Sequence, residues 1–187
     1  LATNFTSTFN SCTSLAEIPA DLLGNNAKIT YVTSMFESCY ALKTVPSELF
    51  AGCPAITSFE ATFALCKGLE SIPADLFAAI GTKTSSINFS ECFLECESLK
   101  TIPASLFDTV RRINYIDNCF NGCIALTGES PYTIVTDAEG NETKVHLYER
   151  TRGEDFPNAP VSASAHVGCF AGCVGLSDYE NIPADWK

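Results

Sequence analysis

The sequence predicts one α/β solenoid of about six repeat coils with an inserted β-hairpin, and three observations lead to this prediction. A frame of Phe, Cys, Leu, Ile or Val, and Pro recurs along most of the 187 residues. A short pair of apolar residues precedes most copies of the frame. Hydrophobic residues make up 46% of the chain and charged residues 18%, which is the composition of a folded protein. The length is small for two independent domains, so we expect a single unit over residues 1–187.

The repeat frame is Phe-x-x-Cys-x-x-Leu-x-x-Ile/Val-Pro-x-x-Leu-Leu/Phe. Four copies are complete, and they begin at Phe9, Phe36, Phe63 and Phe93. A fifth copy begins at Phe120 and breaks off after Leu126, and a sixth begins at Phe170 and reaches Trp186 after a three-residue insertion. The steps between the starting Phe residues are 27, 27, 30, 27 and 50. A period of this length is typical of arrays in which each repeat forms one coil.

Each copy predicts three local elements. Pro at the first turn of a helix loses no needed N–H, and an acidic side chain soon after it meets the positive end of the helix dipole. Pro73–Phe77 fits this pattern, so we expect a short helix after each repeat Pro. We expect a short β-segment around Ile56–Phe59 and its equivalents, and a tight turn or short helix at each Phe-x-x-Cys step. The apolar slots then stack from coil to coil into one core.

Acidic residues recur two positions after the repeat Pro, with Ser105 in the same slot. They are Asp21, Glu48, Asp75 and Asp185. A ladder of calcium ligands is one interpretation. Stabilisation of short helix starts is the simpler one, because side chains there interact with the helix dipole.

Residues 128–168 lack the frame and are interpreted as an inserted hairpin and loop. Apolar and polar residues alternate around Tyr132–Ile134 and Val145–Leu147, on either side of the turn-prone segment 137–141. Gly153, Pro157 and Pro160 indicate a loop that returns the chain to the last coil.

The ten cysteines are explained mostly by the repeat. Six of them occupy one slot in successive copies: Cys12, Cys39, Cys66, Cys96, Cys123 and Cys173. A small side chain in a repeated apolar slot predicts a buried column of free thiols. Zinc sites usually show Cys-x2-Cys pairs or knuckles with His, and neither is present, so we predict no metal. Isolated disulfides stay open as an alternative, with Cys53 the least constrained.

Charge and motifs exclude several function classes. The formal net charge of -11 disfavours nucleic acid as a partner. No apolar run is long enough to span a bilayer, so we expect no membrane insertion by these residues. Neither His146 nor His166 belongs to a recognisable nucleophile motif, and no phosphate-loop or zinc-protease pattern is present. We therefore predict no enzymatic activity and no cofactor.

The rhythm Phe-x-x-Cys-x-x-Leu-x-x-Ile with Pro soon after resembles the BspA-like leucine-rich repeats of bacterial surface proteins. This resemblance covers all but the inserted hairpin, and it implies a right-handed leucine-rich-repeat-like α/β solenoid. It also implies a cell-surface or secreted location and adhesion-type binding to a host extracellular protein or glycan. Because Leu1 falls within a repeat, we expect that an upstream segment with a signal or anchor was removed. Pro directly after the Ile departs from the usual pattern and leaves open which face binds.

Two surfaces are candidates for binding. Exposed positions of the predicted β-segments mix aromatic, hydroxyl, amide and carboxylate groups, which suit protein or glycan recognition. They are Tyr31, Thr33, Ser58, Glu60, Asn88, Ser90, Tyr115 and Asp117. The inserted hairpin is the second candidate, through Tyr148, Arg150 and Arg152. The alternatives are an ordinary solvated sheet face and a hairpin that merely covers an edge of the solenoid.

Two other functions remain open. A purely structural spacer of a larger surface protein needs no ligand. A carbohydrate-active enzyme needs two carboxylates that converge in a cleft between hairpin and solenoid, because acids on neighbouring coils leave no local signature.

Overall fold

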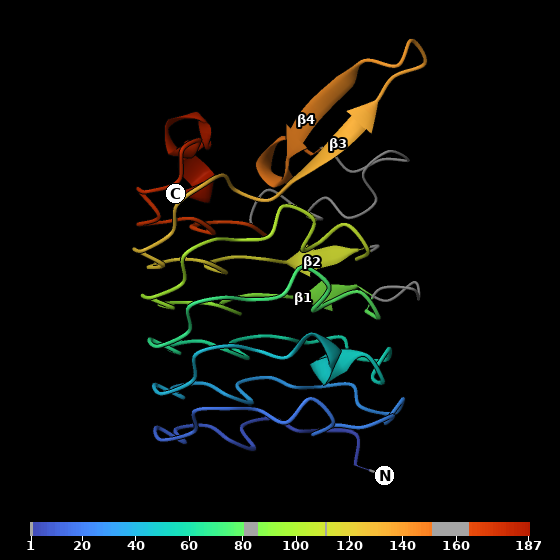
Figure 1. Cartoon of the computed structure of the whole chain (residues 1–187), viewed down its shortest axis with the longest axis vertical. Coiled ribbons are helices and arrows are strands. Elements are labelled where there is room, and N and C mark those ends of the chain that lie inside the picture. The colour runs from blue at the N-terminus through green and yellow to red at the C-terminus, as the bar shows by residue number, and fades with distance from the viewer. Residues whose placement is uncertain (1, 81–85, 111, 151–164) are drawn as a thin grey trace.

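The computed structural model describes residues 2–80, 86–110, 112–150 and 165–187. Successive copies of the frame lie one above another, so that the chain forms a stack of coils (Figure 1). The N-terminus lies at one end of the stack, and the hairpin and the C-terminus lie at the other (Figure 1). The handedness of the coils and their leucine-rich-repeat class stay predictions.

The β-segments pair in parallel along one side of the stack. The strands β1 (Ile87–Asn88) and β2 (Ile113–Tyr115) pair with each other. Elsewhere the ladder consists of single pairs: Asn4 with Tyr31, Tyr31 with Ser58, and Ser58 with Asn88. A further single pair joins another row of the coils, between Thr44 and Ser71.

Residues in the left-handed conformation explain why these strands are so short. Each coil holds one such residue two positions before the frame Phe and another two positions after it. They are Ser7 and Ser11, Ser34 and Ser38, Ala61 and Leu65, Glu91 and Glu95, Asn118 and Gly122, and Gly168 and Gly172. A positive φ turns the backbone out of the extended conformation, so each strand ends there.

Backbone hydrogen bonds continue from coil to coil beyond the strands. In the second coil, the N–H groups of Ser34, Phe36 and Ser38 donate to carbonyls of the third coil at 2.8, 2.9 and 2.8 Å. The same rows recur in the other coils. In these rows the N–H of one coil points to the carbonyl of the next coil. Stacking of the coils therefore supplies hydrogen-bond partners to the backbone groups of the irregular turns.

The frame Phe and the frame Cys residues each form a column in the core. The frame Phe rings stack on one another with centroid separations of 5.5, 5.6, 5.6, 5.4 and 5.8 Å along the series Phe9, Phe36, Phe63, Phe93, Phe120 and Phe170. Beside them, each frame Cys from Cys39 onward donates its thiol to the carbonyl of the Phe one coil earlier, at 3.0 to 3.3 Å. That carbonyl also accepts the N–H of the Cys in its own coil. A thiol fits this slot because it is small, apolar and a weak donor.

The helices expected after the repeat Pro residues are largely turns. A 3-10 helix follows Pro46, η1 (Ser47–Phe50), and another follows Pro183, η4 (Ala184–Trp186). After Pro19, Pro73 and Pro103 the chain makes a turn with one hydrogen bond to the Pro carbonyl. Every helix within the described residues is a short 3-10 helix. Pro and an acidic residue favour only the first turn of a helix, and the hydrogen bond to each Pro carbonyl closes one such turn.

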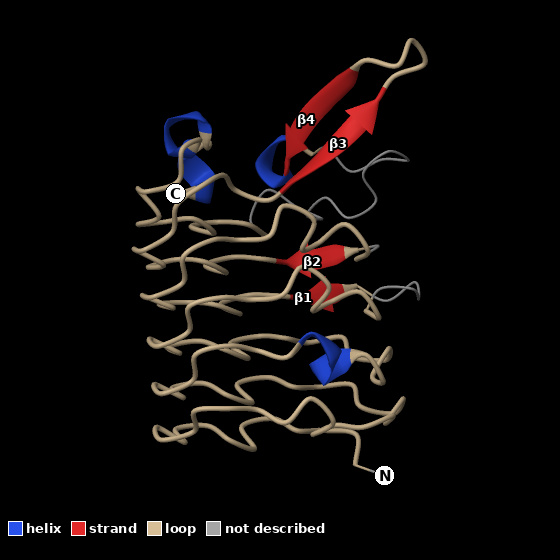
Figure 2. Cartoon of the chain, in the orientation of Figure 1, coloured by secondary structure: helices blue, strands red, loops and turns tan. Residues whose placement is uncertain are grey.

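An antiparallel hairpin projects from the C-terminal end of the stack (Figure 2). Its strands are β3 (Tyr132–Thr136) and β4 (Glu142–His146), and the 3-10 helix η2 (Leu147–Glu149) follows directly. The 3-10 helix η3 (Tyr179–Asn181) lies in the insertion of the last copy. The loop expected around Gly153, Pro157 and Pro160 lies outside the described residues. Across the described part, no helix has the length and apolar character that a bilayer crossing requires.

Candidate functional site

The paired β-segments bring four of the predicted site residues into one row. We call the row formed by Asn4, Tyr31, Ser58, Asn88 and Tyr115 the β-ladder face, because each member pairs with the next. Tyr31 is 48% exposed and Tyr115 is 46% exposed, whereas Ser58 is buried between them. Three coil steps separate the two rings, which corresponds to about 14 Å at the usual strand spacing. The face therefore presents two tyrosines at a fixed separation.

A second row beside it holds the predicted carboxylates, and hydrogen bonds fix them in place. Asn88 Nδ2 donates to Glu60 Oε2 at 3.2 Å. Ser90 Oγ donates to Asp117 Oδ1 at 2.7 Å. Thr33 Oγ1 lies 2.9 Å from Ser58 Oγ. The Asn88–Glu60 and Thr33–Ser58 bonds link the two rows, and the Ser90–Asp117 bond joins neighbouring coils within the second row. The polar groups are thus held in a defined arrangement.

The electrostatic character of this region is acidic. Partial burial raises the pKa of the Glu91 carboxyl, and the neighbouring charges of Asp117, Glu60 and Glu37 raise this pKa further. The ion pairs among the described residues involve other carboxylates. A cationic group would therefore be favoured here over an anionic one.

The structure does not bring Tyr148 and Arg150, the described ones among the predicted hairpin residues, to the β-ladder face. Arg150 is only 7% exposed, and its Nη2 donates to Asp108 Oδ1 at 3.1 Å. Burial lowers the pKa of Arg150, and Asp108 opposes that shift. Its guanidinium therefore does not face solvent, contrary to the expectation of a ligand contact. Tyr148 is partly buried and stacks on His146 at 5.1 Å, and Arg152 lies outside the described residues.

A buried polar cluster joins the hairpin to the insertion of the last copy, and the sequence did not reveal it. Asp178 is 5% exposed and accepts the N–H and the hydroxyl of Ser130 at 3.0 and 2.5 Å. His146 Nε2 lies 3.5 Å from Asp178 Oδ2. Burial, and next the Asp178 charge, raises the pKa of Tyr148. The one signal in the sequence was the three-residue insertion that contains Asp178.

His166 is 9% exposed and packs at the C-terminal end. Its ring stacks on Trp186 at 4.3 Å, and its Nε2 lies 3.0 Å from Asp185 Oδ2. The hydrogen bond to His166 lowers the pKa of Asp185. These contacts make His166 part of the packing of the last coil.

The thiols show no sign of a reactive or metal-binding arrangement. All ten cysteines lie in the described part of the chain and are free; Cys12 is exposed and the other nine are buried. Burial raises the pKa of Cys39 to about 11 and that of Cys66 to about 12. Such thiols stay protonated near neutral pH and are poor nucleophiles. No group of three or more His, Cys, Asp or Glu side chains in the described residues is arranged to hold a metal ion.

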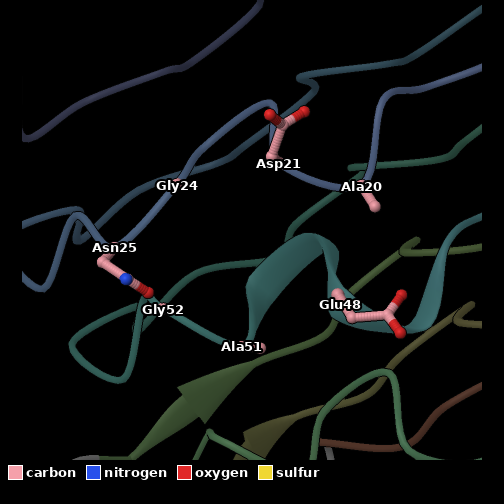
Figure 3. A pocket seen from close by; sticks show the side chains of 7 residues that line it. All are labelled: Ala20, Asp21, Gly24, Asn25, Glu48, Ala51 and Gly52. Atoms are coloured by element: carbon pink, nitrogen blue, oxygen red, sulfur yellow. The ribbon is translucent and has the colours of Figure 1, made fainter.

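An open hollow of about 380 Å³ lies at the other end of the stack, between the first two coils. Asp21 and Glu48 line it with Asn25 and small residues, and the two carboxylates do not point toward one another (Figure 3). Asp21 sits in the turn that follows Pro19, and Glu48 sits in η1, which follows Pro46. The hollow therefore lacks convergent carboxylates. It also lies far along the chain from the hairpin, where the alternative of a carbohydrate-active enzyme would place its site.

The comparisons with known proteins include a distant likeness to a solved structure. No family model matches the chain, and no curated protein matches it. Among solved structures, the chain is similar to a leucine rich cell surface protein from Faecalibacterium prausnitzii A2-165, with 21% sequence identity and a TM-score of 0.42. The match covers 90% of this chain and 42% of that protein.

Proposed function

We propose that this chain is a non-enzymatic binding module of a bacterial cell-surface or secreted protein, built as a leucine-rich-repeat-like solenoid. The observation that carries the proposal is the β-ladder face, on which Tyr31 and Tyr115 are half exposed in one row. Glu60 and Asp117 lie in the adjacent row and are held by Asn88 and Ser90. The surface location follows from the resemblance of the repeat frame to BspA-like repeats.

Physical reasons support this face as the binding surface. Tyrosine offers a large contact area at a low cost in conformational entropy, and it combines an apolar ring with a polar hydroxyl. Hydrogen bonds between the coils hold the polar groups before any ligand arrives, and preorganisation of this kind lowers the cost of binding. The ligand we propose is a host extracellular protein or glycan.

The test is binding of the purified chain to an immobilised panel of extracellular host proteins and glycans. The double variant Tyr31→Ala/Tyr115→Ala should bind any hit at least about 30-fold more weakly, since a central aromatic contact contributes about 2 kcal/mol or more. Tyr40→Ala is the matched control, because Tyr40 is 47% exposed but lies outside the β-ladder face. Ile134→Ser/Val135→Ser tests the hairpin, where these side chains are 49% and 36% exposed.

Each outcome decides between functions. A loss confined to the tyrosine pair supports the β-ladder face. A loss confined to the hairpin variant moves the binding surface to β3. No binding by a folded sample across the panel contradicts the binding module and favours the structural spacer.

A further inference from the structure

The N-terminal end of the stack exposes a surface whose equivalent in each later coil is covered by the preceding coil. We call the side of residues 2–27 that faces away from the second coil the N-terminal face (Figure 1). In every later coil of the described chain, the corresponding side packs against the preceding coil. The N-terminal face is thus one half of an interface that the molecule builds again at each step.

The first feature of this face is a row of backbone acceptors. The carbonyls of Tyr31, Thr33, Met35 and Glu37 accept N–H groups of the first coil at 2.9, 2.9, 2.9 and 2.7 Å. The corresponding carbonyls of the first coil accept no backbone N–H from any described residue. They belong to Asn4, Thr6, Thr8 and Asn10. Such a row is an open edge that can pair with another segment.

The second feature is an apolar column that ends at this face. Phe9 stacks on Phe36 at 5.5 Å on one side only, whereas Phe36 has a ring on both sides. Phe9, Leu15 and Leu22 are partly buried, but their equivalents in the second coil are at most 1% exposed. An apolar hollow of about 40 Å³ opens here, lined by Phe9, Leu15, Glu17, Ile18, Pro19, Leu22 and Phe36.

The third feature is Cys12, which breaks the pattern of its column. The thiols of Cys39, Cys66, Cys96, Cys123 and Cys173 each donate to a Phe carbonyl of the coil before. Cys12 occupies the same slot but is exposed. Its thiol is placed to donate to a Phe carbonyl that a neighbouring coil would supply.

We propose that the N-terminal face is a stacking surface for one further coil of the same Phe-x-x-Cys frame. That coil supplies a row of free N–H groups to Asn4, Thr6, Thr8 and Asn10, a ring to Phe9, and a carbonyl to the Cys12 thiol. The argument is continuity with the coil–coil interface inside the molecule, and it does not depend on the proposed binding function.

The direction of the hydrogen bonds excludes a second copy of this chain as the occupant. Two copies that meet through their N-terminal faces would place one row of acceptors opposite another. A head-to-tail arrangement needs free N–H groups on the last coil. Those of Gly168 and Phe170 already donate to the carbonyls of Asp185 and Trp186 at 3.0 and 2.8 Å. The C-terminal end is thus closed to this kind of stacking.

The test adds one coil to the full chain and measures whether Cys12 becomes protected. A copy of residues 31–57 replaces residues 1–3, which preserves the 27-residue step to Asn4. Cys39→Ala and Cys53→Ala in the copy leave Cys12 as the exposed thiol. Reaction of the folded protein with a thiol reagent should slow about tenfold or more relative to the parent chain, because Cys12 then reacts only through local opening. The melting temperature should rise.

The matched control carries the additional change Phe36→Asp in the copy. This removes the ring that would stack on Phe9 and places a charge in the hollow, so Cys12 should react at the parental rate. Equal reactivity of Cys12 in the parent and in the unaltered fusion, with both folded, would overturn the proposal. A parent chain that is dimeric by light scattering with Cys12 already protected would also overturn it, in favour of a second copy.

Discussion

The thiol of Cys66 donates to the carbonyl oxygen of Phe36 at 3.1 Å, across 30 residues of sequence. The same oxygen accepts the N–H of Cys39 in its own coil at 3.1 Å. One carbonyl thus accepts the hydrogen bond that closes the turn of its own coil and also accepts the thiol of the next coil. The repeated Cys is therefore a structural donor as well as a core side chain.

Removal of a column thiol should destabilise the fold in proportion to its burial. Cys96→Ala should lower the free energy of unfolding by about 1–2 kcal/mol, because the variant loses a buried donor and leaves a small cavity. Cys12→Ala should change it by less than about 0.5 kcal/mol, since that thiol is exposed. Urea unfolding at pH 7 under reducing conditions measures both variants. Equal losses would show that the buried hydrogen bond and packing do not matter.

Alkaline pH should unfold the chain. Burial raises the pKa of Cys39 to about 11 and that of Cys66 to about 12, and it also raises the pKa of Cys92, Cys96 and Cys119. In the unfolded chain these thiols ionise near pH 8.5. Their contribution to stability is complete below that pH and is lost as the pH rises toward the folded pKa values, by up to about 1.4 kcal/mol per pH unit for each thiol.

The urea midpoint, measured at pH 7, 8.5 and 9.5 with reductant, should therefore fall steeply above pH 8.5. The variant Cys66→Ala/Cys96→Ala should show a shallower fall. A midpoint that stays constant up to pH 9.5 would contradict the buried, protonated state of the thiols.

At positions with a positive φ, introducing glycine should stabilise the fold and replacing glycine should destabilise it. Glu95 has a φ of 52°, which costs a residue with a Cβ roughly 1 kcal/mol. Glu95→Gly should therefore raise the free energy of unfolding by up to about 1 kcal/mol. Gly122→Ala, at the equivalent position of the next coil, should lower it by about 1 kcal/mol, because φ is 76° and the new Cβ would lie 3.0 Å from Glu95 Cγ. Thermal unfolding of the two variants provides the comparison.

The phenylalanine column should be most sensitive at its centre. Phe63 stacks on rings at 5.6 Å on both sides and is fully buried, so Phe63→Ala should cost about 3–5 kcal/mol. Phe9→Ala should cost clearly less, since only one face of that ring is covered. Denaturant midpoints rank the two. A larger loss at Phe9 would contradict the stacked arrangement.

The hairpin should depend on the Asp178 carboxylate. Asp178→Asn replaces an acceptor of two Ser130 bonds by a group with donors, so a buried hydrogen bond is lost at a cost of about 1–3 kcal/mol. Limited proteolysis within β3 and β4 should accelerate. Glu142→Gln is the control on the exposed part of β4 and should leave the cleavage rate unchanged.

The repeat frame predicted which side chains are buried better than it predicted the backbone conformation. Because Phe63, Cys66 and Leu69 recur with a fixed period, their burial in columns could be predicted from spacing alone. The segments after Pro73 and Pro103 were expected as helices but are turns, since propensity at the start of a helix does not tell how soon the chain must turn back. The left-handed conformation of Ala61, Leu65 and Glu91 carries no compositional signal.

In the candidate site, too, the repeat period predicted some features and not others. The pairing of Tyr31, Ser58 and Tyr115 in one row followed from the period. The burial of Arg150 against Asp108 did not, because the two residues lie 42 positions apart and belong to no repeat slot. Long-range contacts of an insertion leave no pattern in a single sequence.

The coil-to-coil hydrogen bonds also determine how the chain would bear mechanical load. The first coil is bonded to one neighbour, whereas the last is held by Asp185, Trp186 and the Ser130–Asp178 contact. Tension applied between the ends would therefore peel the molecule from its N-terminal side, one coil after another. Each 27-residue coil would release about 90 Å of extended chain. Under such tension the chain would lengthen stepwise, and its C-terminal end would keep its structure longest.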